Sequence, residues 1–248
     1  MIDGQAPVEI FDEIDSTLSE ARRRAERGDF APVWLVAKVQ TAGRGRRGRA
    51  WRSLDGNLLA TYFSRNDRPP AEIALLGFAL AVAIAETFDT YLGARRALVK
   101  WPNDVLIDGA KMSGILLDSG AAHGAGWAAL GFGVNLAAAP EGLDQPTACL
   151  RQLLPPDALA SEPLAFLDEL RPRLEQLGAQ LAQQGFAPLR QAWLSRAYGL
   201  GQIARVAQGE TVLEGRIAGL SETGALELDT SEGRKLVAAG DVYFSGAS

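Results

Sequence analysis

The segment "ALVKWPNDVLIDGAKMSGILLDSG", residues 97–120, decides the fold class, because it combines short apolar runs with a strand break and a tight turn. Pro102 interrupts the first run, since a proline inside a strand cannot donate a ladder hydrogen bond. The dipeptide Asp108-Gly109 has the composition of a two-residue hairpin turn. The segment therefore predicts antiparallel pairing of the runs on the two sides of this turn.

Strands and helices are expected on both sides of this segment. Apolar runs predict strands at Val8–Ile14, Val33–Gln40, 57–64 and 126–136. A short helix is expected after the first strand, because Thr17 and Glu20 have capping-box spacing and Gly28 is a stop signal. Further helices are expected at 73–92, at 164–181 with a bend or break at Pro172, and at 187–197.

The texture of the sequence changes near Gly199. Short apolar runs separated by glycine and polar turns follow this residue and predict a small β-barrel. We therefore expect two domains, residues 1–198 and residues 199–248. The whole chain is expected to be α+β, with a mixed, mostly antiparallel sheet, flanking helices and the C-terminal barrel.

Composition excludes several classes of function. The chain has 248 residues, a formal net charge of -5 and 47% hydrophobic residues, so we expect a packed core and no general attraction to nucleic acid or anionic membranes. The single Cys149 and the single His123 rule out a disulfide framework and a Cys/His zinc site. His123 lies in an expected exposed turn, and Cys149 is expected to be a small buried hydrophobe.

The sequence gives no sign of a membrane or export signal. The N-terminus has no basic region, and the longest apolar run, residues 73–85, is shorter than the ~20 residues that cross a bilayer. We expect a cytoplasmic protein in which this run forms a buried helix.

A first candidate motif is "GRGRRGRAW", Gly43 to Trp51, which concentrates arginine and glycine. One interpretation is a solvated basic loop. A second is an anion clamp, because guanidinium groups fit phosphate and carboxylate and glycines let backbone N–H groups approach an anion. A third is an arginine-rich nucleic-acid arm, which the acidic remainder of the chain disfavours.

A second motif lies within the opening segment. Lysine stands beside the broken strand, Asn103 and Asp104 follow it, and Lys111 lies across the hairpin turn. This arrangement brings polar groups together at the end of a strand. A single lysine is usually a surface residue, but Lys111 lies in an otherwise small and apolar run.

A third motif is "GFGVN", Gly131 to Asn135, at the end of an apolar run. A glycine pair with this spacing often marks only a tight turn. Asn135 is placed to contact an amide or the edge of a base.

Together the three motifs resemble those of the biotin–protein ligases, in the short form without an N-terminal DNA-binding domain. Residues 40–51 resemble the arginine–glycine loop of that family, "KWPND" with Lys111 and "SGIL" resembles its second signature, and "GFGVN" resembles its third. Ser16 and Thr17 resemble the start of its biotin-site Ser-Thr-Asn motif, whereas Leu18 departs from it. The resemblance covers nearly the whole chain and implies a class II synthetase-like catalytic core with a C-terminal β-barrel.

The resemblance implies a two-step reaction. Biotin and ATP with Mg²⁺ form biotinyl-5′-AMP and pyrophosphate, and a lysine of a biotin carboxyl carrier domain then takes the biotinyl group and releases AMP. No nucleophilic enzyme residue and no tightly held prosthetic group are needed. The loop is expected to be disordered when empty and to fold around the bound anion. The alternative is a lipoate or octanoate ligase or transferase, and the protein is expected to be a monomer or homodimer that binds neither nucleic acid nor membranes.

The resemblance also implies roles for individual residues. Those expected to bind biotin are Ser16, Thr17, Gln40, Gly43, Arg44, Gly45, Arg46, Lys111 and Gly114. Those expected to bind ATP or the adenylate are Arg44, Arg49, Trp51, Asn103, Lys111 and Asn135. Lys111, Arg46 and Asp104 are the expected catalytic residues, with Asp104 serving either the metal or the incoming amine, and no protein-held metal site is expected.

Overall fold

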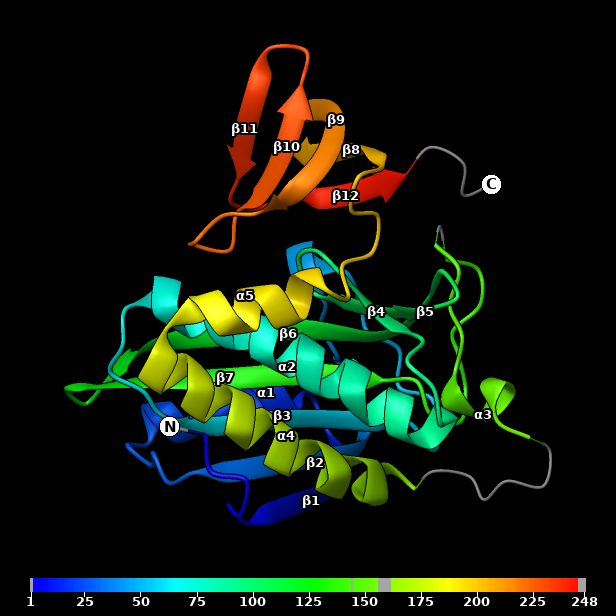
Figure 1. Cartoon of the computed structure of the whole chain (residues 1–248). Coiled ribbons are helices and arrows are strands. Elements are labelled where there is room, and N and C mark those ends of the chain that lie inside the picture. The colour runs from blue at the N-terminus through cyan, green and yellow to red at the C-terminus, as the bar shows by residue number, and fades with distance from the viewer. Residues whose placement is uncertain (1, 144, 156–161, 245–248) are drawn as a thin grey trace.

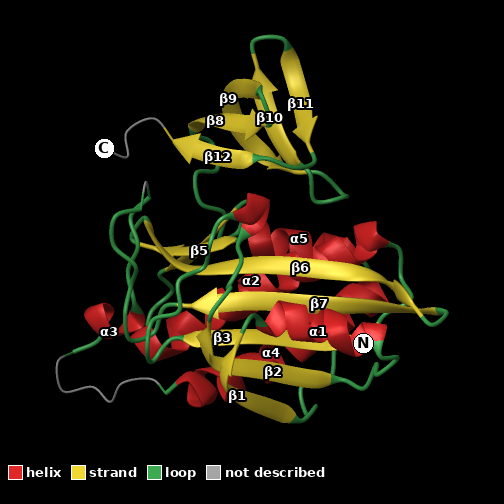
Figure 2. Cartoon of the chain, turned by 180° about the vertical axis from the view of Figure 1, so that it is seen from behind, coloured by secondary structure: helices red, strands yellow, loops and turns green. Residues whose placement is uncertain are grey.

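The computed structural model describes residues 2–143, 145–155 and 162–244, which form a large sheet with helices and a smaller sheet at the C-terminus (Figures 1 and 2). The large sheet has seven strands in the order β1-β2-β3-β7-β6-β5-β4. Its strands are β1 (Val8–Ile14), β2 (Val33–Gln40), β3 (Leu58–Arg65), β4 (Ala97–Lys100), β5 (Asp104–Ile107), β6 (Ala110–Ala122) and β7 (Ala125–Val134). Only the β1–β2 pair among them is parallel, so the expected mixed, mostly antiparallel sheet is confirmed.

Helices cover both faces of this sheet. One face carries α2 (Pro70–Leu92), α4 (Pro163–Gln184) and α5 (Phe186–Leu194), which lie in front of the sheet in Figure 1. The opposite face carries α1 (Thr17–Glu26). Alternation along β2 explains the two layers, because Trp34 joins the cluster of α2 whereas Leu35 joins the cluster that contains Ala21 of α1. The short helix α3 (Leu150–Leu153) lies outside both layers.

Helix α2 is the central element of the core. Its residues Ala79, Leu80 and Val82 are buried between the sheet and the helices α4 and α5. In the described part of the chain it is the one helix long and apolar enough to cross a membrane, but 67% of its most apolar stretch is buried inside the protein. The expected buried helix is confirmed.

Residues 97–120, which contain the broken strand and the hairpin turn, fold as their sequence predicts. Asp108 and Gly109 both have positive φ values, 51° and 81°, which is the geometry of a type I′ hairpin turn. Strands β5 and β6 are antiparallel on either side of it. A turn with a cis Trp101–Pro102 peptide separates β4 from β5, and Lys100 pairs with Asp104 across it.

The C-terminal residues form a five-stranded antiparallel sheet in the order β11-β10-β9-β8-β12. Its strands are β8 (Ile203–Gln208), β9 (Thr211–Leu220), β10 (Leu226–Thr230), β11 (Gly233–Val237) and β12 (Asp241–Phe244). The Trp101 indole donates to the carbonyl oxygen of Gly224 at 3.1 Å, which joins the second motif to this sheet. Asp241, at the start of β12, lies beside the arginine–glycine loop.

One local expectation was wrong. Ser16, not Thr17, is the N-cap residue of α1, and the cap makes no side-chain hydrogen bond. The Thr17 hydroxyl instead contacts Gln40 and Thr61 of the sheet. Of the bend or break expected at Pro172, the break is absent, because α4 runs without interruption from Pro163 to Gln184. His123 is exposed in the β6–β7 turn and Cys149 is buried, as expected.

Candidate active site

The three motifs meet on the α1 face of the large sheet, beyond the N-terminus of that helix. Thr17 begins α1, Gln40 ends β2, and the arginine–glycine loop follows β2 directly. Gly114 of β6 and Gly133 of β7 are paired across the middle of the same face. The topology therefore gathers residues that are far apart in the sequence.

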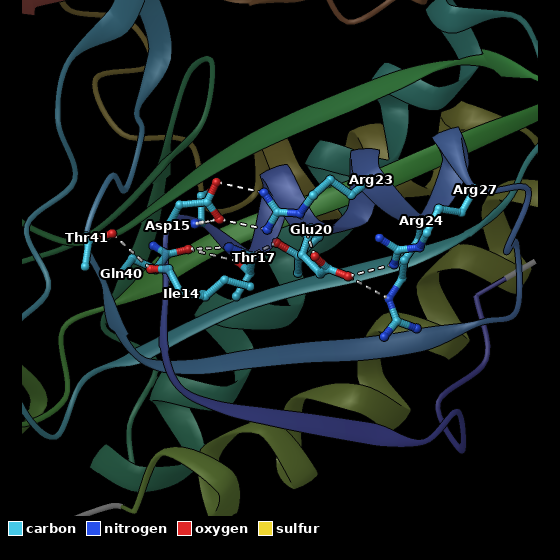
Figure 3. Close-up of polar contacts among 11 residues, drawn as sticks. Ile14, Asp15, Thr17, Glu20, Arg23, Arg24, Arg27, Gln40 and Thr41 are labelled. Carbon is cyan, nitrogen blue, oxygen red and sulfur yellow. Dashed lines mark hydrogen bonds and ion pairs between the residues drawn. The ribbon is translucent and has the colours of Figure 1, made fainter.

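At one end of the site, Gln40 is fixed by Thr17 (Figure 3). The backbone N–H and the hydroxyl of Thr17 both donate to Gln40 Oε1, at 2.8 and 3.0 Å. An N–H group can only donate, so the side-chain atom of Gln40 that faces it is the oxygen. The amino group of Gln40 consequently points away from α1, near Gly43, where an added Cβ would lie 3.1 Å from it.

The carboxyl group of Asp15, next to the same helix start, is held by Arg23 (Figure 3). Both contacts are 2.8 Å long. Hydrogen bonding from the Arg23 guanidinium lowers the pKa of Asp15 to about 2, against a partial opposing effect of burial. The charge of Asp15 is thus neutralised locally. Ser16, which follows it, is 3% exposed.

The arginine–glycine loop is held by one carboxylate of the C-terminal sheet. Asp241 forms ion pairs with Arg46 at 3.3 Å, Arg47 at 3.1 Å and Arg49 at 3.3 Å. The loop also forms a small hairpin of its own, in which Gly45 N–H donates to the Arg49 carbonyl oxygen at 2.6 Å. Burial lowers the pKa of Arg46, partly opposed by the nearby Asp241. Arg46 therefore has its charge compensated from the other sheet.

No motif in the sequence indicates this anchor. The arginines repel one another, as expected, but Asp241 offsets that repulsion from a position 195 residues away in the chain from Arg46. No local pattern links positions so far apart. The expected disorder of the empty loop stays a prediction. Arg44 is exposed, and within the described residues its side chain forms no hydrogen bond or ion pair.

Trp51 lies on a floor made by two paired glycines. A Cβ added to Gly133 would overlap the Trp51 indole, and one added to Gly114 would lie 2.9 Å from its Cζ3. Only glycine at both positions lets a flat ring rest directly on the backbone of β6 and β7. The ammonium group of Lys111 lies 5.7 Å from the centroid of the same ring. This floor is a surface suited to a planar group.

Lys111 is not the lone cation that the sequence indicated. Its Nζ lies 2.7 Å from Asp104 Oδ1, and the two side chains are 20% and 13% exposed. The backbone carbonyl of Lys111 accepts a hydrogen bond from Asn135 Nδ2 at 3.4 Å. Asn135 is 2% exposed and donates a second bond to the Ala148 carbonyl at 3.2 Å, so it supports the strand that carries Lys111.

Two further residues of the second motif, Asn103 and Lys100, lie near the loop or the C-terminal sheet. Asn103 donates to the Ile115 carbonyl at 2.7 Å and accepts a bond from Arg46 at 3.4 Å. Lys100 lies 5.7 Å from the centroid of the Phe244 ring, and burial lowers its pKa, partly opposed by the charge of Asp104. Positive charge therefore converges on this part of the sheet from Lys100, Lys111 and the loop.

No group of three or more His, Cys, Asp or Glu residues within the described part of the chain has an arrangement that holds a metal ion. The carboxylates nearest the site are each engaged by cations, Asp104 by Lys111 and Asp241 by the loop arginines. The arrangement is suited to binding anions.

Comparisons with known proteins identify relatives of this chain and agree with its fold. Residues 26–135 match the biotin/lipoate A/B protein ligase family, and residues 199–245 match the biotin protein ligase C-terminal domain. A biotin–[acetyl-CoA-carboxylase] ligase of Paracoccus denitrificans is 41% identical over 94% of this chain and 98% of its own length. The bifunctional ligase/repressor BirA of Bacillus subtilis is 28% identical over 93% of this chain and 72% of its own length.

A solved structure shows the same architecture with ligands. The biotin protein ligase of Aquifex aeolicus in complex with biotin and ATP superimposes with a TM-score of 0.81 at 25% identity, over 96% of this chain and 99% of that one. Fold and site thus define an α+β ligase with a separate C-terminal sheet. The chain belongs to the biotin protein ligase family, a family of enzymes.

Proposed function

We propose that this enzyme activates biotin with ATP as biotinyl-5′-AMP and transfers the biotinyl group to one lysine of a biotin carboxyl carrier domain. The observation that carries the proposal is the convergence of Lys111 and the loop arginines on the sheet face that also holds Thr17 and Gln40. Polar side chains at one end fit a cyclic urea, and cations at the other end fit a carboxylate and phosphates.

In the first step, an oxygen of the biotin carboxylate attacks the α-phosphorus of ATP, and the bond to the pyrophosphate oxygen breaks. Two anions must approach each other, and further negative charge builds up on the α-phosphate oxygens. Lys111, Arg44 and Arg46 supply the compensating positive charge, and Arg49 and Asn103 contact the phosphates. The protein contributes positioning and electrostatics, without a covalent intermediate.

The nucleotide enters as its magnesium complex. Mg²⁺ keeps several waters and binds phosphate oxygens readily, so it does not require a cage of protein carboxylates. The absence of a metal-holding carboxylate cluster within the described residues is compatible with a metal carried by ATP. The planar adenine is proposed to lie against Trp51. Asn135, whose amino group bonds the Lys111 and Ala148 carbonyls, is proposed to act by holding the strand that carries Lys111.

In the second step, the amine of the acceptor lysine attacks the carbonyl carbon of the anhydride, and the bond to the AMP oxygen breaks. The amine must first lose a proton, because its unperturbed pKa is ~10.4. Asp104 is paired with Lys111 at 2.7 Å. When Lys111 turns to the ligand's anionic groups, Asp104 is released to accept that proton.

The loop is proposed to exchange one anion for another. Asp241 forms ion pairs with Arg46, Arg47 and Arg49. The carboxylate and phosphate of bound ligand compete for the same guanidinium groups, and Gly43 and Gly45 bring backbone N–H groups close to them. The loop then covers the anhydride and protects it from water.

The proposal extends to the organisation of the protein. The catalytic domain comprises residues 1–198 and the C-terminal domain residues 199–248. The enzyme works in the cytoplasm as a monomer or homodimer, with a carrier domain as its macromolecular partner and without nucleic acid or membranes.

The first step is tested by measuring the exchange of labelled pyrophosphate into ATP with biotin, lipoate or octanoate as the carboxylic acid substrate. Biotin is expected to support exchange, whereas lipoate and octanoate are expected to support little. Exchange driven by lipoate or octanoate but not by biotin would replace the proposal with the alternative activity. The Lys111→Ala variant, assayed in parallel, shows whether the exchange belongs to this site.

A further inference from the structure

Thr61 of β3 is a fully buried polar residue directly behind the Thr17–Gln40 pair. Its side chain is 0% exposed, and its Oγ1 lies 2.8 Å from Thr17 Oγ1. It pairs with Leu35 on one neighbouring strand and with Gly131 on the other. Nothing in the three sequence motifs indicates it, because its relation to Thr17 exists only in the folded sheet.

The directions of the hydrogen bonds in this chain are fixed. The Thr17 N–H can only donate, so Gln40 presents Oε1 to it. That oxygen carries no hydrogen, so the Thr17 hydroxyl must donate to it as well, over 3.0 Å. The hydrogen of Thr17 is then used, and the contact between the two threonines requires Thr61 to be the donor.

This order determines what the site offers a ligand. Gln40 Oε1 accepts two hydrogen bonds and has no lone pair left, so the two hydrogens of its amino group are what it presents. Thr17 Oγ1 donates one bond and accepts one, and it keeps a single acceptor position. Among the described residues, the Gln40 amino group makes no hydrogen bond of its own.

We propose that Thr61 is a positioning residue that sets the hydrogen-bond polarity of the biotin site, with Gln40 as donor and Thr17 as acceptor for the cyclic urea of the substrate. A cyclic urea needs this combination, because its carbonyl oxygen accepts while its N–H groups donate. Thr61 acts through Thr17 and does not touch the ligand. The proposal rests on the proposed function, which it refines at the level of substrate class.

Thr61→Val tests the proposal, because valine keeps the shape of threonine and removes the donor. Biotin is expected to bind about threefold to tenfold more weakly to this variant, the effect of losing one neutral buried hydrogen bond. ATP affinity is expected to stay unchanged, and Thr61→Ser is expected to restore biotin binding. Titration calorimetry of the full-length protein measures both ligands.

Thr87→Val is the matched control. Thr87 is also 0% exposed, and its hydroxyl donates to the Ala83 carbonyl at 2.8 Å within α2, on the other face of the sheet. It carries the same chemical change and a similar stability cost, but biotin affinity is expected to remain that of the wild type. If both valine variants lose biotin affinity equally, the effect is general and the positioning role is overturned.

Hydrogen exchange of the Thr17 amide in the empty protein separates this inference from the proposed function. Loss of the Thr61 donor is expected to speed exchange of that amide, and serine is expected to restore protection. Unchanged Thr17 exchange, together with unchanged biotin binding in folded Thr61→Val, overturns the proposal. Faster exchange in an enzyme whose wild type does not bind biotin would confirm the hydrogen-bond chain and refute its role in reading a urea.

Discussion

Replacing Asp241 with asparagine is expected to release the arginine–glycine loop in the empty enzyme. The substitution keeps the size of the side chain and removes the charge that Arg46, Arg47 and Arg49 share. The loop arginines then repel one another without compensation. A larger fraction of molecules is expected to have the loop open, while the fold of both sheets is retained.

The size of the expected shift toward the open loop follows from how exposed the side chains of each Asp241 ion pair are. Arg47 and Arg49 have side chains that are 42% and 62% exposed, so each of their ion pairs contributes about 0–1 kcal/mol. The side chains of Arg46 and Asp241 are 20% and 13% exposed, so leaving Arg46 without its partner costs more stability than losing either exposed pair. The cost is smaller than the ~3–5 kcal/mol for breaking a fully buried pair. A total of about 2 kcal/mol corresponds to roughly a 30-fold shift toward the open loop.

Limited trypsin digestion measures this shift, because cleavage after Arg46, Arg47 or Arg49 requires an open loop. Cleavage is expected to be roughly 30-fold faster in Asp241→Asn than in the wild type when opening is fast relative to cleavage. Biotin with ATP is expected to protect both proteins. Asp229→Asn is the control, because Asp229 lies in the same C-terminal sheet and pairs with Arg234. Equal cleavage rates for Asp241→Asn and the wild type would refute the anchoring role.

Three further predictions concern the site and its surroundings. Lys111→Ala is expected to lower biotin-dependent pyrophosphate exchange by about 100- to 1000-fold, the usual cost of losing a charge that acts on the transition state. Thermal melting checks that the variant is folded, because Asp104 loses its partner. Near-normal exchange by a folded variant contradicts this role. Arg46→Gly is expected to release biotinyl-adenylate about 10- to 150-fold faster, since it removes one charge-assisted hydrogen bond. The released adenylate is expected to biotinylate added serum albumin. Albumin labelling no higher than with the wild type, while adenylate is still made, argues against retention of the intermediate by Arg46. Arg23 lowers the pKa of Asp15 from 3.8 to about 2, so the Asp15–Arg23 pair stabilises the fold above about pH 4 and loses this effect as the pH falls toward 2. The difference in urea midpoint between the wild type and Arg23→Met is therefore expected to be largest near neutral pH and to shrink between about pH 4 and about pH 2. A difference independent of pH contradicts the linkage.

Local sequence signals were sufficient for most of the fold. Asp108-Gly109 has few backbone options other than the turn it forms. The run at Val33–Gln40 matches β2 because residues 33–37 are apolar and buried on both faces. The capping prediction at Thr17 failed for a tertiary reason. Its hydroxyl bonds to Gln40 and Thr61, which outweighs the local cap.

The contacts within the site were harder to predict from the sequence than the fold. The sequence motifs named Trp51, Gly114 and Lys111, but not that Gly114 pairs with Gly133 to form a floor for the indole. That arrangement depends on the register of β6 against β7, which a single sequence does not fix. The partner Asp241 of the loop was missed for the same reason, because it reaches the loop only through the docking of the C-terminal sheet.

Single-turnover transfer tests whether the enzyme hands biotin from a bound adenylate to a carrier lysine. The enzyme is incubated with labelled biotin and ATP, freed of unbound ligand, and mixed with a biotin carboxyl carrier domain or with the same domain carrying arginine in place of its acceptor lysine. Label is expected to pass from the enzyme-bound adenylate to the lysine-containing carrier without further ATP, with AMP released in equal amount. The arginine carrier is expected to stay unlabelled. Failure of label to reach the lysine-containing carrier, although adenylate is bound to the enzyme, would contradict the proposed transfer.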